Sequence, residues 1–202
     1  MPLQNRVDPF SAIHAHPARG MFTGNRGILH DDARRLVSQT WKTDAWIICT
    51  LEYKDRAREV MAPGAYTHLF FLDEATALAA GHRPCFECQR TVATAYCDAI
   101  QKWTRARPAA SAINKAIREE MSPAIRLGER ELVDAETLPA GAMFGLEGEA
   151  YLVRPDGARK WSFEGYGRLE AFPATRVRRL TPLMSIAALE GGYAPRLAES
   201  AG

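Results

Sequence analysis

The chain lacks any apolar stretch approaching the roughly 20 residues that a membrane-spanning helix needs. Residues 1–6 also lack the hydrophobic core of a secretion signal. These two absences predict a cytoplasmic protein with no membrane partner. The formal net charge is only +2, which is too small to require a nucleic acid as partner and is compatible with one.

Familiar catalytic motifs are missing as well. The sequence contains no Ser-x-x-Lys, Gly-x-Ser-x-Gly, Walker loop or His-Glu-x-x-His, so motif matching supplies no enzyme hypothesis. What is present is an ordinary globular composition, with 47% hydrophobic and 25% charged residues among 202. This length fits one large or two small domains.

Cysteine is scarce, with four residues in the chain. Without an export signal we expect thiols or metal ligands rather than disulfides. Cys85 and Cys88 form a Cys-x-x-Cys knuckle, and two thiolates at this spacing can bind one tetrahedral zinc from a tight turn if two further ligands come from elsewhere. A redox pair is the alternative, although no thioredoxin-like βαβ pattern surrounds the knuckle.

The pattern of apolar residues and turns predicts an α+β fold. Residues 1–104 should form a small antiparallel-sheet zinc-knuckle domain, with a loop-rich arm to about residue 27 and a central strand at residues 45–53. Asp73 and Gly81 suit the two ends of a short helix. Residues 105–137 should form a helical connection with a helix that stops at Pro123. Residues 138–202 should form a mostly β region with a short C-terminal helix, fraying from about residue 198.

Residues 70–90, and possibly the chain from Trp46, resemble the zinc-binding module of Ada-type DNA alkylation-repair proteins. The shared pattern is an aromatic strand end, a helix ending Ala-Leu-Ala-Ala-Gly, and Arg-Pro-Cys-x-x-Cys. The resemblance implies a structural zinc bound by cysteines, with Cys49 matching a ligand on an earlier strand. The family's fourth cysteine corresponds to Tyr53, which is not a usual zinc ligand, so a closed site needs one further ligand. His30, His68 and His82 are the candidates, and the predicted ligand set is Cys49, Cys85, Cys88 and His68.

The same resemblance implies DNA or RNA as a possible partner. Arginines around the knuckle, interleaved with aromatic residues, would neutralise phosphates; the predicted contacts are Arg58, Arg83 and Arg90. Arg26, in Gly24-Asn-Arg-Gly27, is a weaker anion contact. Two other functions stay open: an enzyme that uses Cys49 or a metal-bound water with His30 or His68 as base, and a non-catalytic protein-interaction module.

Overall fold

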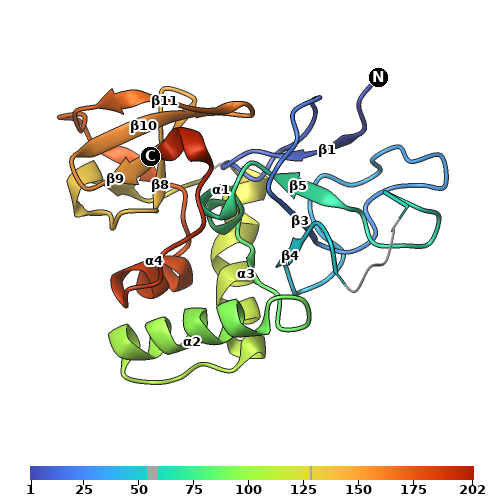
Figure 1. Cartoon of the computed structure of the whole chain (residues 1–202), viewed down its shortest axis with the longest axis horizontal. Helices are drawn as coiled ribbons and strands as arrows, with labels where there is room; N and C mark the ends of the chain where they lie inside the picture. Colours follow the sequence, from blue (N-terminus) through green and yellow to red (C-terminus); the bar gives the residue numbers. More distant parts are fainter. Residues whose placement is uncertain (54–58, 128) are drawn as a thin grey trace.

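The computed structural model describes residues 1–53, 59–127 and 129–202 (Figure 1). Within these ranges it contains two six-stranded sheets and four α-helices, which confirms the predicted α+β class. The helices are α1 (Glu74–Ala79), α2 (Arg90–Thr104), α3 (Ala110–Leu127) and α4 (Leu183–Glu190). Figure 1 shows the two sheets on opposite sides of the molecule, with α1 at their junction.

The N-terminal sheet has the strand order β2-β1-β5-β3-β4-β6. It is mixed rather than antiparallel, because β1 pairs with β5 and β4 pairs with β6 in parallel. The expected loop-rich arm contributes three of its strands, since short alternating segments fit between the turn residues. The strands are β1 (Gln4–Val7), β2 (Ile13–Ala15), β3 (Phe22–Asn25), β4 (Ile47–Thr50), β5 (Leu69–Phe71) and β6 (Arg83–Pro84).

The helix predicted between Asp73 and Gly81 is present as α1. The Asp73 carboxylate caps it by accepting a hydrogen bond from the Thr76 backbone N–H at 2.9 Å. Gly81 follows the helix with a φ of 84°, a conformation that favours glycine. Every residue of α1 is buried. The helix therefore delivers the chain into the knuckle at a fixed position.

Pro123 does not end the third helix as predicted, because α3 continues to Leu127. The residues on either side explain this: Met121 and Ala124 are buried, whereas Pro123 is exposed. Burial of the flanking apolar side chains outweighs the one backbone hydrogen bond that proline cannot donate.

The C-terminal sheet is antiparallel throughout, with the order β11-β10-β9-β8-β12-β7. Five of its six strands, β8 to β12, lie within residues 138–202. One strand, β7, comes from the stretch predicted as a helical connection. The strands are β7 (Leu132–Val133), β8 (Met143–Leu146), β9 (Glu149–Arg154), β10 (Gly157–Ser162), β11 (Gly165–Glu170) and β12 (Val177–Arg179).

The end of the chain is tied to this sheet instead of fraying. Residues Glu199–Ala201 form a 3₁₀ turn whose last residue is buried. Arg159 donates a hydrogen bond from Nη2 to the Gly202 carbonyl oxygen at 2.6 Å. These contacts satisfy backbone groups that a frayed end would leave to water.

One apolar core runs through both sheets. A single cluster of buried residues includes Phe71 and Ile100 from the N-terminal half and Phe144 and Val177 from the C-terminal sheet. Polar contacts reinforce the junction, because the buried Asp73 carboxylate also accepts a hydrogen bond from the Tyr166 hydroxyl at 2.8 Å. Residues 1–104 and 138–202 therefore share a core.

Candidate metal centre

The pairing of β4 with β6 brings two distant parts of the sequence together. Ile48 lies opposite Pro84 in this parallel pair, so that Cys49 and Cys85 are the next residues along the two chains. The Ile48 carbonyl oxygen accepts hydrogen bonds from the Cys85 backbone N–H at 3.0 Å and from the Gln89 side-chain amide at 2.8 Å. The register of the sheet thus places Cys49 beside the knuckle.

The knuckle turn presents backbone N–H groups to sulfur. The N–H of Glu87 donates to Cys85 Sγ at 3.4 Å, and the N–H of Gln89 donates to the Cys85 carbonyl oxygen at 3.0 Å. Hydrogen bonds of the first kind stabilise a thiolate. The turn is therefore suited to holding a deprotonated cysteine.

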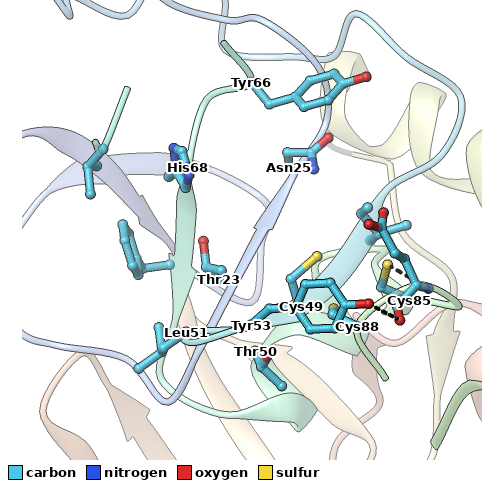
Figure 2. A pocket seen from close by; sticks show the side chains of 14 residues that line it. Thr23, Asn25, Cys49, Thr50, Leu51, Tyr53, Tyr66, His68, Cys85 and Cys88 are labelled. Atoms are coloured by element: carbon cyan, nitrogen blue, oxygen red, sulfur yellow. Dashed lines mark hydrogen bonds between the residues drawn. The ribbon is translucent and has the colours of Figure 1, made fainter. Parts of the chain in front are cut away.

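The sulfur atoms of Cys49, Cys85 and Cys88 all lie within 4.8 Å of one another (Figure 2). Tetrahedral zinc with Zn–S bonds of ~2.3 Å needs sulfur atoms about 3.8 Å apart, a spacing within that limit. These three predicted ligands are thus brought together, and they can hold a metal ion. Among the described residues, no other group of three or more histidine, cysteine or acidic side chains meets the same test.

The three thiols do not ionise independently. Hydrogen bonds from the thiols of Cys49 and Cys88, together with backbone N–H groups, lower the pKa of Cys85. The hydrogen bonds to Cys85 and Cys88, with burial, raise the pKa of Cys49. The pKa of Cys85 is thus lowered while that of Cys49 is raised, because adjacent negative charges repel one another. A bound cation would supply the charge that lets all three deprotonate.

The three cysteines open onto a cavity of about 280 Å³. Its walls come mainly from β3, β4, β5 and the knuckle turn. The lining residues are Thr23, Asn25, Ile47, Cys49, Thr50, Leu51, Tyr53, Val60, Tyr66, His68, Phe70, Cys85, Glu87 and Cys88. All three cysteines therefore border one shared space.

His68 lines this cavity but is not part of the three-sulfur group. Figure 2 shows it across the cavity from the cysteines. Its Nδ1 accepts a hydrogen bond from the Met61 backbone N–H at 3.2 Å, so the neutral ring carries its proton on Nε2. Coordination through either nitrogen would require this arrangement to change.

The other two candidate histidines have structural roles. His30 is buried, with Nδ1 at 2.6 Å from the Thr67 hydroxyl and Nε2 at 3.3 Å from the Ala62 carbonyl oxygen. His82 is fully buried and accepts a hydrogen bond at Nε2 from Arg26 Nε at 3.2 Å. Neither is among the residues that line the cavity, so neither is placed to act as a base there.

Tyr53, where the Ada-like sequence pattern would place a fourth cysteine, lines the cavity together with Cys85 and Cys88. Its hydroxyl donates a hydrogen bond to the Glu87 carbonyl oxygen at 3.2 Å. The phenol thus fastens the chain after β4 to the knuckle turn. In the structure this position stabilises the turn by a hydrogen bond instead of a thiolate.

The predicted nucleic-acid contacts are placed very differently. Arg83 is only 6% exposed, and its Nε donates to Asn114 Oδ1 at 2.8 Å, so it does not fit a role as a surface contact. Arg90 is exposed at the first residue of α2. Arg58 lies outside the described residues.

Arg26 is also inside the fold rather than at an anion-binding surface. It is fully buried, packs over Trp46 at 5.1 Å and donates to His82 and to the Ser11 carbonyl oxygen. Burial lowers the pKa of Arg26 to about 9. Sequence reasoning missed this interior cluster because an arginine between two glycines looks like an exposed loop residue.

None of the helices in the described part of the chain has the length and apolar character needed to cross a bilayer.

The sequence analysis also missed Gln89, whose side-chain amide donates a hydrogen bond to the Ile48 carbonyl oxygen beside the cysteines. No local signal in the sequence distinguishes this residue.

Comparison with family models, curated proteins and solved structures gave no match.

Proposed function

We propose that this chain is a zinc protein in which Cys49, Cys85 and Cys88 hold the metal. The observation that supports this most directly is the gathering of three sulfur atoms within 4.8 Å from β4 and the turn before α2. Thiolate ligands favour zinc over the harder divalent cations magnesium and calcium. The bound metal would join the start of α2 to the N-terminal sheet, so that its binding energy contributes to folding.

The test is the metal content of the purified protein, measured by inductively coupled plasma mass spectrometry. We expect one zinc per chain and its loss in the variant Cys85→Ser/Cys88→Ser. Cys97→Ala is the matched control, because Cys97 is a buried cysteine outside the three-sulfur group. A wild-type protein without metal, produced in zinc-supplemented medium, would contradict the proposal.

The proposed role of the module is contact with nucleic acid, as its Ada-like sequence pattern implies. The supporting feature is Arg90, which is exposed two residues after Cys88 at the start of α2. A helix N-terminus with an adjacent arginine favours a phosphate group. Zinc would position this end of the helix without taking part in chemistry.

Fluorescence anisotropy with single- and double-stranded DNA and RNA tests this role at several salt concentrations. Arg90→Ala should weaken binding and reduce the logarithmic salt slope by about 1. Arg168→Ala is the control, because Arg168 is highly exposed on β11 in the C-terminal sheet. An affinity that does not change with salt concentration, or an equal loss of affinity in the two variants, would contradict nucleic-acid contact at the knuckle.

A further inference from the structure

The cysteine site has three protein sulfurs where a closed zinc site has four ligands. Structural zinc sites are usually closed, whereas sites that act on other molecules keep one position open. In the described part of the chain, no fourth histidine, cysteine or acidic side chain joins the three sulfurs. Tyr53 and His68 border the same space, but each is held by a backbone group.

We propose that the fourth coordination position faces the cavity and binds a small thiol. This inference rests on the proposed zinc site and extends it from a structural to a ligand-binding role. The cavity supports it because all three cysteines line one space of about 280 Å³, large enough for a molecule of several heavy atoms.

The walls of the cavity favour a ligand with an apolar body. Leu51, Val60 and Phe70 supply apolar surface, and Tyr66 adds an aromatic ring. Thr23 and Asn25 place polar side chains among them. Burial against such walls favours the binding of a hydrocarbon group, whereas a strongly hydrated group would bind less well because it must give up its water.

The charge of the site selects against a second negative charge on the ligand. Three thiolates around a divalent cation carry a net charge of −1, and among the described residues Glu87 is the only aspartate, glutamate, lysine or arginine that lines the cavity. A phosphate, or a carboxylate elsewhere on a thiol, would add further negative charge and meet repulsion. A simple thiol adds only the charge of its sulfur, and it gives its proton to the solvent when that sulfur binds.

A thiol also suits the metal better than an alcohol does. Thiols ionise near pH 8.5, whereas hydroxyl groups hold their protons far more strongly, so a thiol loses its proton on binding at much lower cost. Sulfur donors are the type that a zinc site built from cysteines already accepts. Binding requires no oxidant or reductant, because the only change is the exchange of a proton for the metal.

Cobalt(II) replaces zinc in the test, because its thiolate charge-transfer absorption reports the number of bound sulfurs. The full chain is kept reduced with a phosphine, so that no other thiol is present. Addition of 2-phenylethanethiol should raise this absorption by about one third, as three sulfur ligands become four. Its affinity should exceed that of 2-mercaptoethanol roughly tenfold, because the phenyl group enters the apolar cavity.

The outcomes separate the two proposals. Cobalt bound with three-thiolate absorption that does not respond to saturating thiol would overturn this inference and leave the metal site standing. Failure to bind cobalt or zinc at all would overturn the proposed function itself.

A cavity variant locates the thiol. Tyr66→Ala should weaken binding of 2-phenylethanethiol several-fold without changing the affinity for cobalt, since Tyr66 lines the cavity and is no ligand in the site. Val37→Ala is the control, because Val37 is exposed elsewhere and does not line the cavity. Equal thiol affinities in both variants would place the thiol outside the cavity and overturn the inference.

Discussion

Loss of the metal should lower the free energy of unfolding by an amount that depends on the length of the loop that the metal closes. The perturbation is Cys85→Ser/Cys88→Ser, which removes two of the three sulfurs and leaves Cys49 on β4. In the native protein the metal would cross-link β4 to the knuckle, closing a loop of roughly 36 residues between Cys49 and Cys85. Without the cross-link, the unfolded chain regains the entropy of that loop.

The chain-entropy relation for a cross-link of this loop length predicts about 4 kcal/mol of lost stability at 25 °C. This is an upper value, because zinc also binds the closely spaced cysteine pair in the unfolded chain. For a protein of this size, about 2–4 °C of Tm accompanies each kcal/mol. We therefore expect the melting temperature to fall by up to about 8–16 °C.

Thermal unfolding followed by circular dichroism, with and without a zinc chelator, measures the effect. Chelation should lower the Tm of the wild-type protein and of Cys97→Ala by similar amounts, while the double variant should not respond. If the wild-type Tm is unchanged after mass spectrometry shows that its zinc has been removed, the cysteines do not couple metal binding to folding and the argument fails.

Two further predictions concern the scaffold around the site. Gly191→Ala should destabilise the fold by about 1–3 kcal/mol, because the new Cβ would lie 1.9 Å from the Ala99 carbonyl oxygen on α2. Gly167→Ala is the control, because its new Cβ would lie no closer than 3.7 Å to any neighbour, and it should change the free energy of unfolding in urea by less than about 0.5 kcal/mol. Equal destabilisation by the two substitutions would refute the close packing of α2 against the end of α4. Burial and the charge of Arg26 hold the pKa of His82 well below 6.5. Below pH 6.5 the unfolded chain therefore binds a proton at His82 that the folded protein does not bind. The contribution of His82 to the free energy of unfolding should therefore be fully present above pH 6.5 and should fall below that pH by up to about 1.4 kcal/mol per pH unit. The variant His82→Phe should lose this pH dependence. If the pH dependence persists in the variant, burial of His82 is not its cause.

Several parts of the fold follow from signals within a few residues. Asp73 and Gly81 mark the ends of α1 because capping involves only neighbouring backbone groups. The Cys-x-x-Cys spacing predicts a metal knuckle for the same reason, since a tight turn brings Cys85 and Cys88 together without help from the rest of the chain. The alternating strands of the C-terminal sheet are likewise local patterns.

Tertiary packing decided what these signals could not. Pro123 remains inside α3 because its neighbours Met121 and Ala124 are buried. The local rule that proline ends a helix does not take such tertiary burial into account. Arg83 looks like a surface cation in the sequence, yet the paired edge of β4 and β6 places it inside the fold.

The same division applies to the metal centre. The sequence by itself determined that a cysteine knuckle exists and that Cys49 lies on an apolar strand. Only the parallel register of β4 and β6 placed Cys49 beside Cys85, and only the positions of β3 and β5 set His68 across a cavity from the three sulfurs. The physical reason is that helix caps and turns depend on contacts between near neighbours, whereas strand register depends on burying side chains that are far apart in the chain.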